Sequence, residues 1–521
     1  MQIGIDFGTC FSIIAFTERK NNPTIPGNYQ NGIPSTFMYS QTQKKYLFGN
    51  ECDIGESIFD PADVIRHIKK KVRENPDNLD YPPLKTGGKE FSIRYILENY
   101  LDYLIGFCLT VAEESAEISE PLDAVTITVP VGISSGRMMS TDYRLLLQNT
   151  VMKLTGLPAD KVYVLEEPVA AALSYCFVKE RRKRVDKTQK VLVFDLGGGT
   201  CDTSIVEYNS FSNECFVKAS EGDLNLGGND WDDALANDIM RKYGLTEFSD
   251  DNERASFIKA MNDLKHKLSR KTSESVNFKY KGRTFVVEDY TRKEFEAATK
   301  HLLDKAMALV HKTVSSYSSQ GIQAIDKIVL VGGSCNMPQV VDRLKQEFPQ
   351  KTTEIRLFDP SGAIARGAAI HASLMQDIGV VDRIVNQITS KTYGFSSFNS
   401  GLNKQMIFNM IYKDTPFKDK DTIENSSGKA FTPLNDDQAQ ATFIVYESEN
   451  VKGTGPHADW SDFNHGERPN GLVVSVDIPA EYENKATQYA LYPTFTLDKN
   501  GIFNLIIRDK DGRIVSKKRN V

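Results

Sequence analysis

The sequence is poor in cysteine, with seven among 521 residues. The seven are scattered, and no two of them form a C-x-x-C pair. Because their number is also odd, the pattern favours neither a zinc site nor a disulfide framework. Free thiols in a reducing compartment are the expected state. Cys10 and Cys201 fall inside two glycine-containing loops, but no histidine adjoins either in the sequence, which disfavours a catalytic thiol.

Long apolar runs are missing as well. None reaches the ~18 residues of a membrane-spanning helix, and the N-terminus lacks a basic segment followed by an apolar one. These absences predict a cytoplasmic protein with no membrane partner. The net charge is −6, so composition gives no reason to expect nucleic acid as a partner. The basic run at residues 179–184 is interpreted as a solvated connecting loop.

What the sequence does contain is an apolar strand that ends in an aspartate and a run of glycines. Residues 191–194 are apolar, Asp195 ends the strand, and residues 197–200 read Gly-Gly-Gly-Thr. Glycines let the backbone turn tightly and present N–H groups to an anion. An aspartate at a strand end can hold a hydrated metal ion beside that anion. The pattern therefore predicts a phosphate-binding loop.

The same design appears at the N-terminus, where a short strand at residues 3–5 is followed by Asp6, Gly8 and Thr9. Two matching loops indicate an internal repeat in which each half supplies one phosphate clamp. A third strand, at residues 325–331, also runs into a glycine turn. A chain of 521 residues is too long for one hydrophobic core, so at least two domains are expected.

Periodicity places further elements along the chain. Residues 92–116 carry apolar side chains at helical spacing. Thr291 and Glu294 form a capping box that starts a long helix, and Gly321 is expected to end it. Later segments alternate with period two, which predicts strands at residues 441–446, 472–478 and 502–508, with hairpin turns at Asn500-Gly501 and Asp511-Gly512.

Together these motifs resemble those of the seventy-kilodalton heat-shock chaperones of the DnaK type, in the actin-like ATPase superfamily. The matching segments are residues 6–9 and 195–202 for two phosphate motifs, 165–172 for a connecting helix, 222–230 for a further signature and 331–334 for the adenosine motif. Order and spacing match over roughly residues 1–375. The resemblance implies an α/β fold, a duplicated actin-like ATPase domain with a nucleotide cleft, followed by a smaller all-β sandwich domain.

The resemblance also implies domain boundaries. The nucleotide-binding domain covers residues 1–375, with halves 1–190 and 191–375, and residues 376–391 form a linker. Residues 392–521 resemble the family's peptide-binding β-sandwich. The family's linker is rich in leucine, whereas this one offers only Val380, Val381, Ile384 and Val385, which predicts weakened coupling between the domains. No counterpart of the family's helical lid follows the β domain in the sequence.

A magnesium-dependent ATPase site follows from the same resemblance. Asp6 and Asp195 are expected to hold Mg²⁺ through water. The implied catalytic residues are Lys69, Glu167, Asp195 and Thr200, with Lys69 neutralising charge on the phosphate and Glu167 orienting the attacking water. Lys69 is the best match within its basic run, although a shift of the alignment to Arg66 stays open. The implied nucleotide-binding residues are Gly8, Thr9, Cys10, Gly197, Gly198, Gly199, Thr200, Gly227, Lys265, Ser269, Gly332, Gly333 and Ser334.

Two positions depart from the family at the adenosine end. Asn262 stands where the family has a glutamate, and Asn336 stands where it has an arginine that stacks on adenine. Asparagine cannot stack as a guanidinium does. These departures predict weaker nucleotide affinity than in typical members.

The function implied is an ATP-binding and ATP-hydrolysing chaperone-like protein that binds unfolded or extended polypeptide. ATP, ADP and Mg²⁺ are the implied ligands, and a co-chaperone or exchange factor is an implied partner. One alternative is a nucleotide-gated scaffold with little turnover, which the altered linker and adenosine contacts favour. A small-molecule kinase on the same fold is a further alternative, and the C-terminal β domain disfavours it.

Overall fold

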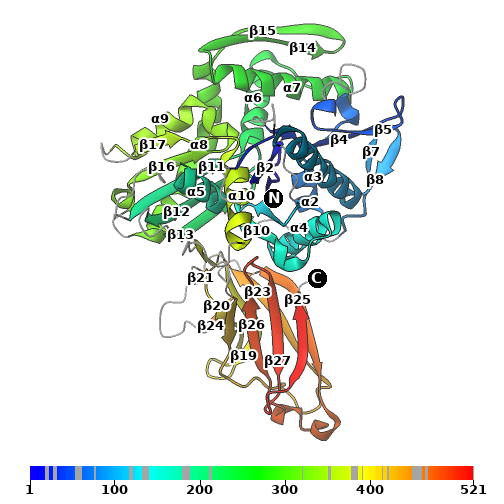
Figure 1. The fold of residues 1–521 in the computed structure, drawn as a ribbon, viewed down its shortest axis with the longest axis vertical. Helices are drawn as coiled ribbons and strands as arrows, with labels where there is room; N and C mark the ends of the chain where they lie inside the picture. The colour runs from blue at the N-terminus through cyan, green and yellow to red at the C-terminus, as the bar shows by residue number, and fades with distance from the viewer. Residues whose placement is uncertain are drawn as a thin grey trace. The chain divides into compact units, whose positions relative to one another are not determined.

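The computed structural model describes the chain in segments, which are residues 1–17, 23–26, 32–52, 61–75, 78–116, 121–131, 140–178, 188–209, 214–318, 321–349, 354–376, 385–389, 391–413, 415–418, 422–448, 460–463 and 468–519. The chain divides into two compact units. The first combines Met1–Met138, Gln148–Asn213 and Ala219–Asp382, and the second combines Met139–Leu147, Glu214–Lys218 and Arg383–Val521. Figure 1 colours both along the chain.

The first unit contains two sheets built to one plan. In the first sheet the strand order is β10-β9-β1-β2-β3. Strands β1 (Gln2–Asp6) and β2 (Phe11–Thr17) form an antiparallel hairpin. On the other side of β1, strands β9 (Ala124–Val129) and β10 (Val162–Glu166) continue in parallel, and β3 (Ile33–Pro34) pairs with β2. The predicted phosphate loop at residues 7–10 joins the two strands of the hairpin.

The same plan recurs in five neighbouring strands of the second sheet, in the order β17-β16-β11-β12-β13. Strands β11 (Gln189–Leu196) and β12 (Cys201–Asn209) form the antiparallel hairpin, and β16 (Lys327–Val331) and β17 (Glu354–Leu357) continue in parallel. Strand β13 (Glu214–Asp223) lies next to β12. Since two parallel strands flank an aspartate-ended hairpin in both sheets, the predicted internal repeat is confirmed.

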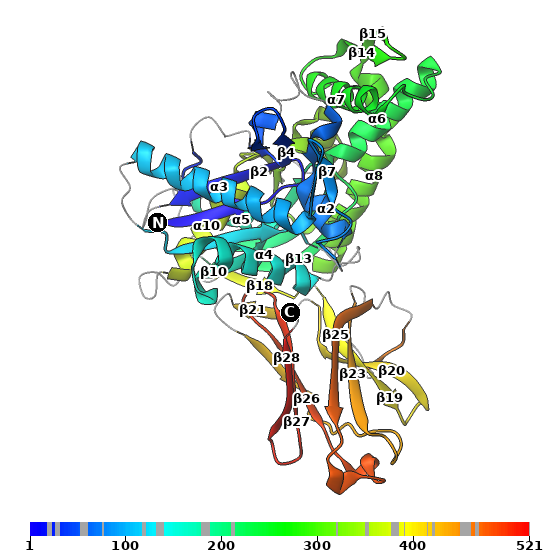
Figure 2. The same ribbon diagram turned by 90° about the vertical axis from the view of Figure 1, so that its right-hand side faces the viewer.

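Two helices pack closely on each other at a glycine, and one of them also packs on the first sheet at a second glycine. Helix α10 (Ala363–Gln376) lies beside α5 (Glu167–Val178) in Figures 1 and 2. A Cβ atom on Gly367 of α10 would lie 1.7 Å from the carbonyl oxygen of Ala170, and one on Gly4 of β1 would lie 2.1 Å from the amide nitrogen of Ala369. Only glycine permits such close backbone approach, so the alanine- and glycine-rich sequence of α10 is what lets it pack there.

The remaining elements of the first unit surround this frame. The helix predicted at residues 92–116 is confirmed as α3 (Ile93–Ala116), which lies beside α2 (Ile68–Glu74) in Figures 1 and 2. Further strands and helices are β4 (Thr36–Ser40), β5 (Lys45–Phe48), β6 (Ile65–Arg66), β7 (Leu84–Thr86), β8 (Lys89–Phe91), α6 (Gly228–Tyr243), α7 (Asp251–Leu268), β14 (Ser273–Tyr280), β15 (Arg283–Thr291), α8 (Arg292–Tyr317) and α9 (Pro338–Glu347). Helix α4 (Ser140–Thr155) is divided between the two units at Gln148. Among the helices described, none is both long and apolar enough to cross a membrane.

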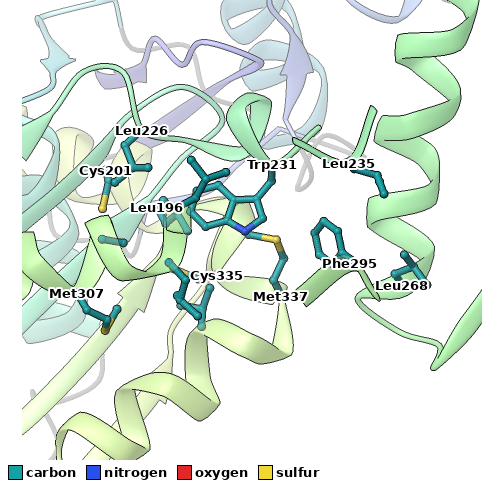
Figure 3. Packing of buried hydrophobic residues seen from close by; sticks show 14 of the residues in the cluster. Leu196, Cys201, Leu226, Trp231, Leu235, Leu268, Phe295, Met307, Cys335 and Met337 are labelled. Carbon is teal, nitrogen blue, oxygen red and sulfur yellow. The ribbon is translucent and has the colours of Figure 1, made fainter. Parts of the chain in front are cut away.

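The core of the second half forms around Trp231 of α6, whose side chain is fully buried. Figure 3 shows its indole beside Leu196, at the end of β11, and Met337, which follows the predicted adenosine motif. A large aromatic side chain buries the most apolar area per residue. The second phosphate loop, the start of α6 and the adenosine motif are therefore all anchored to one hydrophobic cluster.

The capping box predicted at the start of α8 is confirmed. Thr291 Oγ1 accepts from the backbone N–H of Glu294, and the Glu294 carboxylate accepts from the backbone N–H of Thr291. The predicted end of this helix is wrong, because α8 stops at Tyr317 and Gly321 begins a separate 3₁₀ turn (Gly321–Ala324). Gly321 does adopt a left-handed conformation, with φ 59°, but it does so after the helix has ended.

Replacing Glu294 by alanine should destabilise the first unit by about 1 kcal/mol, a typical cost for loss of a cap. Hydrogen bonds from Lys242 and Thr291 lower the pKa of Glu294 from 4.5 to about 2. Because the folded-state pKa is depressed, this stabilisation is present above the unfolded-state pKa near 4.5 and is lost as the pH falls towards 2. Urea denaturation followed by Trp231 fluorescence, in a Trp460→Phe background, measures it between pH 7 and pH 3.

The matched control for the cap is Glu296→Ala, which removes a carboxylate from the same helix and leaves the capping box intact. We expect this variant to unfold like the parent at every pH. A Glu294→Ala cost that stays constant from pH 7 to pH 3 would show that packing of the side chain, rather than its charge, supplies the stabilisation.

The second unit is all β in its C-terminal part, in agreement with the period-two prediction. One sheet has the order β24-β20-β19-β23-β25 and the other has the order β22-β26-β27-β28. Figure 2 labels most of these strands. Their bounds are β19 (Thr392–Asn399), β20 (Lys404–Ile411), β22 (Ile423–Ser426), β23 (Gln440–Ser448), β24 (Trp460–Ser461), β25 (Arg468–Asp477), β26 (Tyr492–Leu497), β27 (Phe503–Arg508) and β28 (Ile514–Arg519). The three predicted strands correspond to β23, β25 and β27, and both predicted hairpins form.

Aromatic side chains fill the space between these two sheets. The ring of Phe395 lies 4.7 to 6.0 Å, between centroids, from those of Phe408, Phe431, Phe443 and Phe495. Most of these contacts are tilted or edge-to-face, the arrangement that aromatic pairs prefer. The β domain therefore has a hydrophobic core of its own.

Two predictions fall on residues outside those described. The basic run at residues 179–184 is one, and the linker residues Val380, Val381 and Ile384 are the other. Val385 begins strand β18 (Val385–Ile388), which pairs with Cys215 and Phe216 and with β21 (Pro416–Lys418). The domain boundaries proposed from the sequence stay predictions.

Candidate functional site

The two predicted phosphate loops face each other in the first unit. A Cβ atom on Gly198 would lie 2.4 Å from Cys10 Sγ, and one on Gly199 would lie 2.8 Å from Cγ2 of Thr9. A side chain at either glycine would push the loops apart. The fold thus brings together two loops that lie almost 190 residues apart in the sequence.

The start of α6 and the adenosine motif both attach to the second loop. The carbonyl oxygen of Gly197 accepts from the N–H of Gly228 at 2.9 Å and from Ser334 Oγ at 2.9 Å. Gly227 packs so closely on Gly199 that a Cβ there would lie 2.5 Å from its backbone. Gly332, with φ 84°, precedes Gly333 and Ser334 in the turn. The predicted glycines and Ser334 therefore form one continuous surface with the second loop.

Lys69 and Glu167 form a buried ion pair beside these loops. Lys69 Nζ lies 2.5 Å from Glu167 Oε1, and the two side chains are 2% and 5% exposed. Lys69 is the second residue of α2, and Glu167 is the first residue of α5. The structure therefore pairs Lys69, rather than Arg66 at the end of β6, with the predicted water-orienting carboxylate.

Three aspartates adjoin this pair at the ends of the two hairpins. Burial raises the pKa of Asp6 to about 8, and the nearby Glu167 carboxylate adds to the shift. Burial also raises the pKa of Asp195 and of Asp202 well above the ordinary value, again with a contribution from Glu167. With four carboxyl groups and the ammonium group of Lys69 in a water-poor site, ionising all the acids is unfavourable unless another cation is present.

This donor set fits a hydrated magnesium ion. Asp195 Oδ1 and Asp202 Oδ2 are buried and have no hydrogen-bond partner among the described residues. Buried carboxylate oxygens normally have partners, and Mg²⁺ is typically held by one or two carboxylates while it keeps several waters. Within the described residues, no three His, Cys, Asp or Glu side chains form a group able to hold a metal directly.

At the predicted adenosine end of the site, Lys265 links α7 to the start of α6. Its Nζ donates to Asp232 Oδ2 and to the carbonyl oxygen of Gly228, both at 2.8 Å. Asn262 also donates to Asp232 Oδ2, at 2.8 Å. Ser269 Oγ donates to the carbonyl oxygen of Lys265 at 3.0 Å, one turn back along α7. Lys265 therefore lies at the predicted site with its ammonium already engaged, while the Ser269 hydroxyl serves the end of its own helix.

The second departure from the family, Asn336, lies at the surface. Its side-chain amide donates to the carbonyl oxygen of Gly333 at 2.9 Å. This bond turns the amide back onto its own loop. Because a small amide presents no broad planar cation, the prediction of weaker adenine contacts at this position remains.

Several residues at the site were not predicted individually from the sequence. Asp202 belongs to the second phosphate motif, and it lies directly across the β11–β12 hairpin from Asp195. Counting outward from the loop along both strands would have paired these two residues. Asn229, Asp232 and His67 carry no such signal, because only the fold brings them to the loops.

Cys10 lies between three elements. Its thiol donates to Asn229 Oδ1 at 3.0 Å, and its Sγ lies 3.7 Å from His67 Nδ1. Burial raises the pKa of the Cys10 thiol to about 11 and lowers that of His67 to about 4. A neutral thiol and a neutral imidazole therefore meet here near pH 7. A histidine does adjoin Cys10 in space, but a thiol with a raised pKa makes a poor nucleophile.

Comparison with known proteins assigns the chain to a family. The family model described as Hsp70 protein matches residues 2–518. A curated relative, the chaperone protein HscA of Buchnera aphidicola subsp. Schizaphis graminum (strain Sg), is 26% identical over 525 residues, which cover 98% of this chain and 77% of the relative. The chain therefore belongs to the Hsp70 family of chaperones, and the fold class expected from the sequence is confirmed.

Proposed function

We propose that this protein binds and hydrolyses ATP in its first unit and binds unfolded or extended polypeptide through residues 392–521. The observation that carries the first part is the convergence of two glycine loops on the buried Lys69–Glu167 pair. Backbone N–H groups on both loops can grip a polyphosphate from two sides. Phosphoryl transfer needs mainly positioning and charge neutralisation, and this arrangement supplies both.

Each charged residue has a distinct role in this proposal. The Lys69 ammonium neutralises charge that develops on the phosphate. Glu167, which the same ammonium orients, accepts a hydrogen bond from the attacking water and takes its proton. Thr9 and Thr200 offer hydroxyl groups to the phosphate, and both side chains are at least nine-tenths buried.

Asp6 and Asp195 would hold Mg²⁺ through water, and Asp202, facing Asp195, would accept a hydrogen bond from that hydration shell. When bound, the ion supplies charge neutralisation on the phosphate oxygens. It also removes the electrostatic cost of ionising three buried aspartates beside Glu167. The carboxyl groups are therefore best matched to a state in which the cation is present.

The polypeptide-binding part rests on the family and on the β-sandwich of the second unit. Extended peptides bind β domains through main-chain hydrogen bonds, with pockets for individual side chains. The aromatic core around Phe395 stabilises the domain, whose strand edges could then form main-chain hydrogen bonds with a peptide. A co-chaperone or exchange factor belongs to the same proposal.

The test is steady-state phosphate release from ATP by the full chain, with and without a permanently unfolded polypeptide. We expect Mg²⁺-dependent release that needs no acceptor molecule and that the polypeptide accelerates. Release only in the presence of a small-molecule acceptor would indicate a kinase. Polypeptide binding that depends on nucleotide but is not accompanied by phosphate release would indicate a scaffold. Either result would overturn the proposed ATPase function.

A further inference from the structure

His67 has a left-handed backbone conformation just before helix α2, which carries Lys69. It precedes the first residue of α2, with φ 58° and ψ 49°, and it makes no side-chain cap for that helix. The left-handed conformation is unfavourable for a residue with a Cβ atom. Such residues persist where surrounding contacts determine their conformation, and they cluster at functional sites. Lys69 follows only two residues later.

Contacts of the imidazole ring with the first phosphate loop account for this backbone. The Nδ1 atom of the ring lies 3.7 Å from Sγ of Cys10, the last residue of that loop. The Cys10 thiol in turn donates to Asn229 Oδ1, at the start of α6. The ring therefore connects the loop that would hold the phosphates to the start of the helix that carries Lys69.

The backbone offers a second but weaker connection through Ser35. Ser35 N–H donates to the carbonyl oxygen of Cys10 at 2.8 Å, and Ser35 Oγ donates to that of Gly8 at 2.8 Å. The bond that continues into α2, from Ile68 N–H to Ser35 O, is 3.5 Å long. Since hydrogen bonds weaken at such distances, Ser35 holds the loop firmly but α2 loosely, and the contact of the His67 ring with Cys10 is a second connection between the loop and the start of α2.

We propose that His67 is a positioning residue for hydrolysis, which fixes the first phosphate loop relative to Lys69. This inference rests on the proposed ATPase function and deepens it. The ring touches neither the carboxylate cluster nor Lys69 in any recorded hydrogen bond or ion pair among the described residues. It acts instead by setting the distance between the phosphate, held by backbone N–H groups at residues 8–10, and the Lys69 ammonium.

The decisive variant is His67→Gly in the full chain. Glycine adopts the left-handed backbone without strain, so the fold should be as stable as the parent or more so, while the ring is lost. We expect turnover of ATP to fall roughly 10- to 100-fold, as for other small misplacements of reacting groups. The dissociation constant for ATP should change by no more than about threefold, because the loops that bind it are intact.

Two further variants separate positioning from stability. His67→Asn also tolerates the left-handed backbone, and its amide keeps a polar donor facing Cys10 of the first loop, so it should recover part of the lost turnover. Lys281→Gly is the matched control, because Lys281 has the same kind of backbone, with φ 50°, in the exposed β14–β15 turn. We expect Lys281→Gly to hydrolyse ATP at the parental rate.

Three results would overturn the proposal. The first is parental turnover in His67→Gly, and the second is a loss of turnover that accompanies an equal loss of thermal stability. The third comes from crystal structures of the parent and of His67→Gly, if the loop-to-Lys69 geometry is the same in both. This last comparison tests positioning even if the parent protein fails to hydrolyse ATP, a failure that would overturn the proposed function separately.

Discussion

Replacing Asp195 by asparagine should lower Mg²⁺-dependent ATP turnover by roughly 100-fold or more, a loss typical for removal of one strong electrostatic contributor. Asparagine has nearly the same shape as aspartate but cannot carry the negative charge that attracts the cation. Asp195 is 3% exposed, and its Oδ1 has no hydrogen-bond partner among the described residues. We also expect the affinity of this variant for ATP to be the same with and without Mg²⁺, as measured by calorimetric titration in the absence and presence of EDTA.

The stability of this variant separates a site effect from unfolding. Burial raises the pKa of Asp195 well above its ordinary value, so the metal-free protein favours a neutral side chain there. A neutral amide should therefore leave the metal-free fold as stable as before. Asp304→Asn, which removes a surface carboxylate of α8 paired with Lys300 and Arg343, is the control and should keep full turnover. Unaltered turnover in Asp195→Asn would mean that the site is wrongly assigned.

Local patterns predicted the parts of this structure that local forces determine. The strand–aspartate–glycine motifs at Asp6 and Asp195 predicted the strands β1 and β11 and the turns that follow them, since strand patterning and glycine turns act within a few residues. The Thr291–Glu294 capping box predicted the start of α8 for the same reason. The end of α8 was wrong by four residues because a glycine marks a left-handed backbone but does not say whether the helix has already stopped.

Contacts between distant residues could not be predicted from periodicity. Lys69 and Glu167 are 98 residues apart, and only the family resemblance suggested that both belong to the site. Cys10 and Asn229 are 219 residues apart, and neither pattern nor resemblance pointed to their hydrogen bond. The same is true of His67, whose neighbours in the sequence suggested an exposed basic run. Such contacts depend on how the two halves of the repeat close on each other.

The duplication places strand ends from both halves beside the two loops. The strand next to the hairpin is β9 in the first sheet and β16 in the second, and β10 and β17 lie one strand further out. Glu167 follows β10 and Gly332 follows β16, so these two residues occupy non-equivalent positions of the repeat. The first half supplies a carboxylate beside Lys69, and the second supplies a glycine turn at the predicted adenosine end.

Replacing Lys69 by alanine should leave ATP bound but slow its hydrolysis roughly 100-fold or more, because one cation that faces the reacting phosphate is lost. Binding should persist because it depends mainly on the backbone of the two glycine loops. Glu167 would lose the ammonium that lies 2.5 Å from its Oε1. We therefore also expect the water-orienting carboxylate to be less well ordered. Single-turnover phosphate release with prebound ATP measures the chemical step apart from binding.

Arg66→Ala is the matched comparison for Lys69→Ala, because it removes a cation three residues earlier in the same basic run. Arg66 lies at the end of β6 and is partly exposed, whereas Lys69 is 1% exposed. Exposed charges are screened by water and contribute little at a distance. Arg66→Ala should therefore retain most of the turnover. If instead Arg66→Ala stops hydrolysis and Lys69→Ala does not, the buried Lys69–Glu167 pair is structural and the reacting phosphate lies nearer to Arg66.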